Sequence, residues 1–273
     1  MSAFLSWLQS LFGRFRPSPR TVGDPTSSNR ASSFHLWWDV TTREKLIGAS
    51  VILEIIEEPQ VLRLHFWALQ ASFADPGGGG AHLGLQFHPE YPASRAVNWG
   101  GYAPAAEGGQ LQGSVSLLPS TLRNDNTRDF PWQGGRTYRL VIARSSTPAP
   151  REGFQAWSGA VIDLESGERT HVRDLYSRGR YLTAPVVWTE SFARCDHPSV
   201  AVRWSDLTVV AEDGGTFVID AVSANYQTKQ AGGCDNTNAT VDDVGWVQRT
   251  NTQRTAAPGS TLARETTAEG PVA

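Results

Sequence analysis

The distribution of apolar residues along the chain predicts a series of short β-strands. Runs rich in β-branched and aromatic residues alternate with turns that contain Gly, Pro or charged residues, and this pattern is typical of strands. We expect about eleven strands, in the residue ranges 34–40, 47–56, 61–71, 81–87, 95–102, 111–118, 136–144, 153–164, 184–192, 201–211 and 216–226.

Alternation within these runs indicates which face of each strand is buried. In residues 61–71 one set of apolar side chains alternates with Arg63, His65 and Trp67, as expected for a strand with a single buried face. The predicted buried set is Leu62, Leu64, Phe66 and Ala68. The predicted fold class is all-β, a two-sheet antiparallel β-sandwich of jelly-roll or concanavalin-like type.

The N-terminus is the one segment with a helical pattern. In residues 1–16 the side chains of Phe4, Leu8, Leu11 and Phe15 recur at intervals of three and four, which predicts a short amphipathic helix. Basic residues follow this segment and do not precede it, so it does not fit a secretory signal peptide. We expect peripheral contact with a membrane surface, and the alternatives are docking on its own domain or a misassigned start codon.

The remaining boundaries follow from composition. Residues 17–33 are rich in Ser, Pro, Asn and Arg without periodicity, which predicts a flexible linker. The sandwich domain is expected at 34–250, and a disordered tail at 251–273. The net charge of -3 gives no basic field for a phosphate backbone, so no nucleic-acid partner is expected.

The two cysteines favour a disulfide. Cys195 closes a predicted strand, and Cys234 lies in a polar segment that a bridge would hold against the sheet. Two unpaired thiols are the alternative. A disulfide favours an extracellular or cell-surface location over the cytosol, which conflicts with the missing signal peptide.

Motifs for catalysis and metal binding are sparse. No Glu-x-Asp-x-Glu run supplies two carboxylates on one strand face, no His or Cys spacing fits zinc, and "DPGGGG" lacks the Gly-Lys-Ser/Thr of a phosphate loop. We therefore expect no catalytic residue, no metal and no cofactor. Glu190 is the exception worth following, since it shares a strand face with Trp188 and Phe192; an ion pair with Arg194 or Arg203 is the simpler interpretation.

Aromatic residues next to Gly or Pro suggest a ligand platform. Rings at such turns can project from a sheet, where their flat faces suit sugar rings and nearby amides suit hydroxyl groups. The candidate ligand-binding residues are Trp99, Tyr102, Trp132, Trp157, Gln86 and Asn98. The alternative is that these rings fill the ends and corners of the sandwich.

A family resemblance rests on several of these segments. "HLGLQF", "AVNWGGY", "GFQAWSGAVIDLESGE" and "VVWTESFARCDHPSVAVRWSD" resemble a bacterial β-sandwich family of unknown function. The matching positions are Gly84, Gln86, Trp99, Gly159, Asp163, Gly167, Glu190, Cys195 and Trp204. The resemblance implies a concanavalin-like sandwich, often extracellular, and supplies no catalytic residues.

Three functions remain open on the sequence. The first is a non-catalytic carbohydrate-binding or cell-surface module whose partner is a glycan or cell-surface polymer. The second is a polysaccharide-active jelly-roll hydrolase or lyase, and the third is a structural protein docked to a membrane or partner by residues 1–16.

Overall fold

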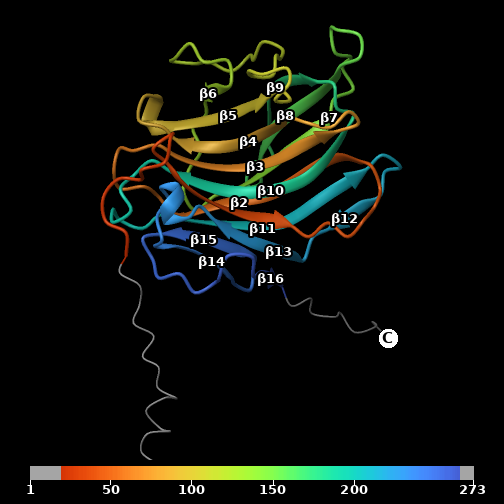
Figure 1. Ribbon diagram of the computed structural model, residues 1–273. Helices are drawn as coiled ribbons and strands as arrows, with labels where there is room; N and C mark the ends of the chain where they lie inside the picture. Colours follow the sequence, from red (N-terminus) through yellow and green to blue (C-terminus); the bar gives the residue numbers. More distant parts are fainter. Residues whose placement is uncertain (1–19, 265–273) are drawn as a thin grey trace, which may run out of the picture.

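The computed structural model describes residues 20–264, which form an all-β protein (Figure 1). Sixteen antiparallel strands are hydrogen-bonded into one sheet that folds over into two layers. The predicted β-sandwich is thereby confirmed. We call the two layers A and B, and they join where Leu182 pairs with Leu46.

The outer face of layer A contains the candidate site described below. Its strands are hydrogen-bonded in the order β16-β13-β1-β10-β3-β4-β5-β6, and Figure 1 shows β10, β3, β4 and β5 side by side. Their bounds are β1 (Ser32–Trp38), β3 (His65–Ala74), β4 (Gly80–Phe87), β5 (Arg95–Tyr102), β6 (Thr127–Asp129), β10 (Tyr181–Ser191), β13 (Ala221–Tyr226) and β16 (Thr261–Ala263).

Layer B covers the other side of the core. Its strands follow the order β14-β15-β11-β2-β7-β8-β9, and β12 adds to β11. Their bounds are β2 (Leu46–Glu57), β7 (Thr137–Arg144), β8 (Gln155–Asp163), β9 (Arg169–Ser177), β11 (Ala201–Ala211), β12 (Thr216–Val218), β14 (Thr237–Val241) and β15 (Trp246–Thr250).

Aromatic side chains from both layers fill the space between them. Six tryptophans are among the largest fully buried side chains, namely Trp67, Trp99, Trp132, Trp157, Trp204 and Trp246. One buried amide joins the layers: Gln248 of β15 accepts hydrogen bonds from Trp204 and Thr189 and donates one to the carbonyl of Phe34. Because each buried polar atom is paired, this network fixes the relative position of the layers at little energetic cost.

The predicted buried face of residues 61–71 is wrong. β3 begins at His65, Leu62 is exposed, and the side chains that enter the main core are Trp67 and Leu69. Phe66 and Ala68 point to the opposite, outer face, where they belong to a second apolar cluster. Alternation fails as a guide here because both faces of this strand are buried.

Several strands also differ from the prediction. Residues 111–118 form no strand beyond an isolated bridge at Gly113, and residues 216–226 are divided into β12 and β13. β9, β14 and β15 were not predicted because their sequences are polar. Residues 251–263, expected as part of a disordered tail, continue along the domain and end in β16 against β13; residues 265–273 lie outside the described residues.

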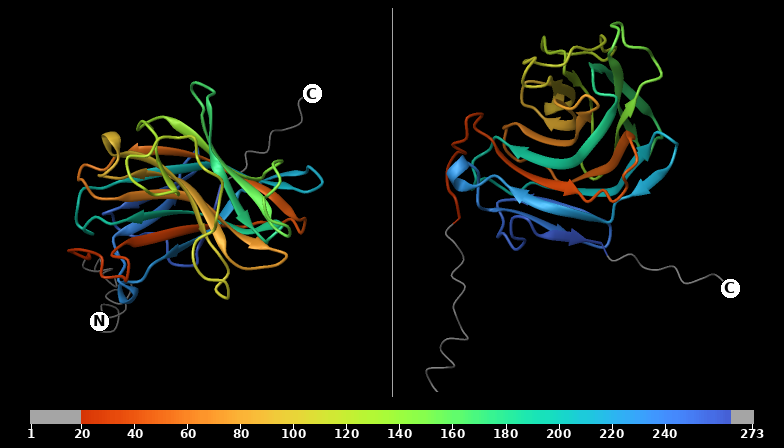
Figure 2. Two further views of the ribbon diagram at one scale, coloured as in Figure 1. Left: turned by 90° about the horizontal axis from the view of Figure 1, so that it is seen from above. Right: turned by 45° about the vertical axis from the view of Figure 1, so that its right-hand side comes forward.

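The N-terminal segment is held against the domain from residue 21 onward, which corrects the predicted linker at 17–33. The amide of Thr21 donates to Asp235 and the amide of Cys195 donates to the carbonyl of Gly23. Figure 2 shows this segment, in red, beside the 3-10 turn η2 (Lys229–Ala231), in blue. The helix predicted for residues 1–16 lies outside the described residues, so its membrane contact stays a prediction.

The predicted disulfide is confirmed. Cys195 and Cys234 are bonded, with 5.5 Å between their Cα atoms. The bridge joins the segment after β10 to the segment before β14, and the amide of Cys234 donates to Ser32 at the start of β1. Across residues 20–264, no helix is long and apolar enough to span a membrane.

Candidate active site around Glu190

Three of the four rings proposed as a ligand platform are core side chains. Trp99 and Trp157 have no exposed surface and Trp132 has 1 %. The Trp132 indole donates to the carbonyl of Gln86, the Trp157 indole donates to the carbonyl of Gly179, and the Trp99 ring packs directly over Gly159. A side chain at position 159 would collide with that ring, so the neighbouring glycine admits the tryptophan into the core.

Tyr102 is the exposed member of the predicted set, with 45 % of its surface accessible. Trp99 lies three residues earlier in β5, and residues three apart on a strand point to opposite faces of the sheet. The two rings therefore cannot form one stacking surface.

The two amides of the predicted set lie on the outer face of layer A. Asn98 is 8 % exposed and donates to Thr127, while Gln86 is 6 % exposed and its side-chain oxygen has no hydrogen-bond partner among residues 20–264. A buried acceptor without a partner costs free energy, and such atoms are found at sites that bind a ligand or an ordered water. Gln86 is thus retained as a candidate binding residue.

The outer face of layer A carries a second apolar cluster, made of Phe66, Ala68, Val186 and Trp188. The rings of Phe66 and Trp188 meet edge to face at 4.8 Å, and the Trp188 indole donates to the side chain of Gln70 over 3.2 Å. We call this the outer cluster. Its four side chains are at most 7 % exposed, so this part of the outer face is apolar and largely buried.

Glu190 lies at the end of the outer cluster. In β10 it pairs with Phe66 of β3, which pairs in turn with Gln86 of β4, so the three side chains form one row across the sheet. Its carboxylate accepts a hydrogen bond from the Asn29 side chain over 2.9 Å. Burial raises the pKa of Glu190 above its usual value, and the hydrogen bond from Asn29 opposes that rise.

The expected ion pair of Glu190 with an arginine is wrong. Arg194 pairs with Asp196, and Arg203 pairs with Glu54 and Asp242. In residues 20–264 no arginine is hydrogen-bonded to Glu190, and because an arginine would favour the charged form of the carboxyl, burial dominates its pKa.

A surface hollow lies next to Asn29, and Glu190 itself is not among the residues that line it. Its volume is about 590 Å³, within the usual range for small-ligand sites. Asn29, the hydrogen-bond partner of Glu190, and Phe192, two residues further along the chain, both line it. Arg30 and Arg63 add positive charge to the wall.

Sequence reasoning singled out Glu190 but not the residues around the hollow. Asn29 is 161 positions away in the chain and belongs to the segment expected to be a linker. No spacing rule connects two such positions; only the folding of residues 20–31 onto layer A brings them together. In residues 20–264 no cluster of three or more His, Cys, Asp or Glu side chains is arranged to hold a metal ion.

The arrangement is suited to proton transfer. A carboxyl whose pKa is raised by burial can donate a proton at mildly acidic pH and recover it from water. The Asn29 amide has a second N–H for a substrate oxygen, and the hollow supplies room for the substrate. A carboxyl that can transfer a proton, an amide donor and room for a substrate are the groups that a hydrolytic site with a single carboxyl requires.

Comparisons with known proteins do not assign the chain to a family. No family model matches the chain, and no curated protein matches it. The resemblance to a bacterial family is therefore supported only at the level of an all-β sandwich.

Solved structures of similar architecture include two kinds of protein. Scytalido-glutamic peptidase with a peptide-based transition-state analogue is 10% identical, with 84% of this chain and 99% of that chain covered and a TM-score of 0.44. SCP-B, an eqolisin peptidase in a complex with the tripeptide Ala-Ile-His, is also 10% identical, with 84% of this chain and 99% of that chain covered and a TM-score of 0.43. Peanut lectin with a 9mer peptide is 10% identical, with 87% of this chain and 93% of that chain covered and a TM-score of 0.30.

The prediction of a non-catalytic carbohydrate-binding module is wrong. The rings Trp99, Trp132 and Trp157, on which it rested, are core side chains. Three of the similar solved structures are of peptidases.

Proposed function

We propose that this protein is a hydrolase that cleaves peptide bonds, with Glu190 as its general acid and base. The single observation that carries the proposal is the position of Glu190: a carboxyl with a raised pKa, without an arginine partner in residues 20–264, hydrogen-bonded to Asn29 in the wall of an open hollow. Perturbed carboxyls in clefts are candidates for catalysis because stability alone would favour a paired or exposed group.

The reaction follows from the donors and acceptors present. The Glu190 carboxylate removes a proton from water as the water oxygen bonds to the carbonyl carbon of the substrate. The Asn29 amide donates a hydrogen bond to the oxygen that gains negative charge. Glu190 then returns its proton to the amide nitrogen as the C–N bond breaks, which releases a carboxylic acid and an amine.

A peptide in extended conformation suits the rest of the surface. Peptide N–H groups recur along such a chain, and the unpaired side-chain oxygen of Gln86 accepts a hydrogen bond of this kind. The outer cluster offers an apolar wall between Gln86 and Glu190 for a substrate side chain. Three similar solved structures are of glutamic peptidases, but the proposal depends on Glu190, because a lectin has a similar architecture as well.

We also propose that the protein works in an oxidising compartment outside the cytosol. The support is the disulfide between Cys195 and Cys234, because reducing cytosol keeps most such pairs open.

The test is a cleavage assay on a mixture of unstructured peptides, followed by mass spectrometry between pH 3 and pH 8. We expect cleavage by the wild-type protein and a loss of roughly 100-fold or more in Glu190→Gln. The matched control is Glu54→Gln, since Glu54 is also on an outer strand face but is paired with Arg203.

Equal cleavage by wild type and Glu190→Gln would contradict the assignment of Glu190. Absence of any cleavage, together with release of sugars from a polysaccharide panel run in parallel, would contradict the peptide substrate and leave the carboxyl in place.

A further inference from the structure

Two arginines are buried at the edge of the sandwich, away from Glu190. Arg128 of β6 is 8 % exposed and Arg173 of β9 is 5 % exposed. Arginine is seldom buried to this extent without carboxylate partners, because removing its charge from water is costly. The pair therefore requires an explanation.

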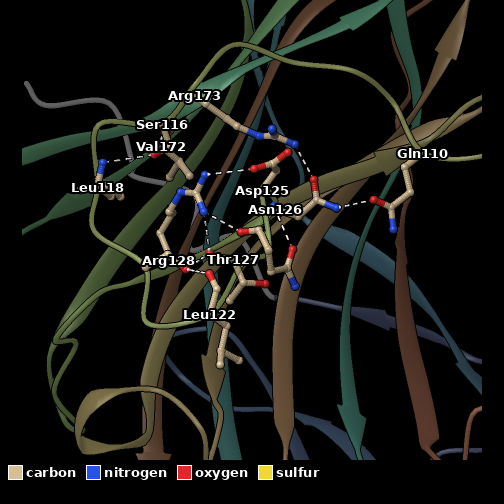
Figure 3. A network of polar contacts seen from close by, with 12 residues as sticks. Gln110, Ser116, Leu118, Leu122, Asp125, Asn126, Thr127, Arg128, Val172 and Arg173 are labelled. Atoms are coloured by element: carbon tan, nitrogen blue, oxygen red, sulfur yellow. Dashed lines mark hydrogen bonds and ion pairs between the residues drawn. The ribbon is translucent and has the colours of Figure 1, made fainter.

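Both side chains lie where the last strands of the two layers approach each other, beneath the segment 110–126. Arg128 follows Thr127, which pairs with Asn98 at the edge of layer A, and Arg173 lies against Gly113. Figure 3 shows the guanidinium groups converging on Asp125 and Asn126 from opposite sides.

Most of their hydrogen-bond partners are neutral. Arg128 donates to the carbonyls of Asn124 and Thr127, at 2.5 and 3.3 Å. Arg173 donates to the side-chain oxygen of Asn126, whose amide donates to Gln110 over 2.9 Å (Figure 3). Carbonyl and amide oxygens satisfy individual N–H groups but leave the charge uncompensated.

Acidic compensation is incomplete in the described part of the chain. Across residues 20–264, Asp125 is the single acid that forms an ion pair with either arginine; it lies 3.7 Å from Arg128, and its side chain is 90 % exposed. The Nε atoms of both Arg128 and Arg173 are buried and have no hydrogen-bond partner. Two positive charges and one negative charge leave a net charge of +1 at this site.

Electrostatics at Arg173 show the same imbalance. Burial lowers the pKa of Arg173, Asp125 opposes this effect, and the neighbouring charge of Arg128 adds to it. The structure thus holds two like charges together without a sufficient counter-ion of its own.

We propose that Arg128 and Arg173 form a binding site for a carboxylate group. A carboxylate carries the single negative charge that the site lacks, and its two oxygens match the paired N–H groups on one edge of a guanidinium. The group can come from a free carboxylic acid or from a peptide, as its C-terminus or an acidic side chain. This proposal does not depend on hydrolysis at Glu190 and holds if that function fails.

The experiment is a calorimetric titration of the full-length protein with sodium acetate, at constant ionic strength set with sodium chloride. We expect saturable binding that weakens at least tenfold in Arg128→Gln and Arg173→Gln. The matched control is Arg139→Gln, which removes a half-buried arginine paired with Asp206 in layer B and should leave acetate affinity unchanged. Circular dichroism at the titration temperature checks that each variant is folded.

A second variant decides the question if the arginine variants unfold. Asp125→Asn alters an exposed side chain and removes the internal counter-charge, so acetate should bind roughly three- to tenfold more tightly at low ionic strength. Unchanged or weaker binding would overturn the proposal, as would the absence of saturable binding in the wild type.

Two further probes identify the ligand. A short peptide with a free C-terminus is compared with the same peptide amidated, both in Glu190→Gln so that no cleavage occurs. Tighter binding of the free acid than of acetate supports a peptide ligand, and equal binding supports a small carboxylate. Tighter binding of inorganic phosphate than of any carboxylate would overturn the choice of ligand.

Discussion

The outer faces of the two layers differ in how their charged side chains are paired. On layer B charged residues pair across strands: Arg203 of β11 contacts Glu54 of β2 at 2.5 Å and Asp242, between β14 and β15, at 2.8 Å, and Arg139 of β7 contacts Asp206 of β11 at 2.6 Å. On layer A the outer cluster replaces such pairs, and Glu190 has an amide as its partner.

This difference separates charged groups that are held in ion pairs from a carboxyl that has only an amide partner. Exposed ion pairs keep a strand face soluble at little energetic gain or loss. Partial burial of the Glu190 carboxyl beside an aromatic cluster opposes its charged form, and carboxyls with perturbed pKa values gather at functional sites. Under the proposed function, layer A carries the catalytic face and layer B supports it.

The largest expected effect separates the two faces by stability. Trp188→Ala should lower the free energy of unfolding by about 3–5 kcal/mol, because Trp188 is 7 % exposed and packs on Phe66. Arg139→Ala on layer B should cost no more than about 1 kcal/mol. Urea unfolding curves measure both values, and equal costs would remove the contrast between the faces.

Lowering the pH should reduce the stability of layer A first and that of layer B at lower pH. Burial lowers the pKa values of His35, His65 and His82, all on layer A, from 6.5 to about 4. Their neutral forms are favoured in the folded state, so stability present above pH 6.5 should be lost as the pH falls toward 4, by roughly a few kcal/mol in total. Unfolding midpoints at pH 7, 5.5 and 4.5 test this.

A carboxylate of layer B should respond at lower pH. The hydrogen bond from Arg249 lowers the pKa of Glu57 below 4.5, against the opposing effect of burial, so its contribution is lost only below that pH. His82→Gln should flatten the loss between pH 6.5 and 4.5. A slope identical to that of the wild type would contradict the assignment to layer A.

Salt should act on layer B alone. The ion pair of Arg139 with Asp206 is half-exposed and the screening length at 1 M ionic strength is about 3 Å, so the cost of Arg139→Ala should fall in 1 M sodium chloride. The cost of Trp188→Ala should persist, because it arises from lost packing. A salt-sensitive Trp188 variant would show that polar contacts, and not the outer cluster, stabilise layer A.

The smallest effect concerns Glu190 itself. Its pKa is raised in the folded state by burial, so its contribution to stability is present below the usual value of 4.5 and is lost as the pH rises through the folded value. Glu190→Gln should therefore raise the melting temperature at pH 7, and the gain should shrink below pH 4.5. A lower melting temperature at pH 7 would indicate a stabilising carboxylate.

Much of the strand pattern could be predicted because apolar runs between turns mark strands regardless of their position in the sandwich. Polar strands such as β14 and β15 could not, since their pairing partners decide their structure. Trp99 was misjudged because a ring beside glycine was interpreted as exposed, whereas Gly159 on another strand makes room for it. Glu190 was found from its alternation with Trp188, but its partner Asn29 depends on a contact between distant segments.

The location of Trp188 allows tryptophan fluorescence to report on the outer face of layer A. Trp188 and Trp37 lie on the outer face of layer A, whereas Trp67, Trp157 and Trp204 emit from within the core. A ligand that binds beside Glu190 should change the surroundings of Trp188, which lies two residues away on the same face of β10. Intrinsic fluorescence, resolved by quenching with acrylamide, therefore reports occupancy of this face without any attached dye.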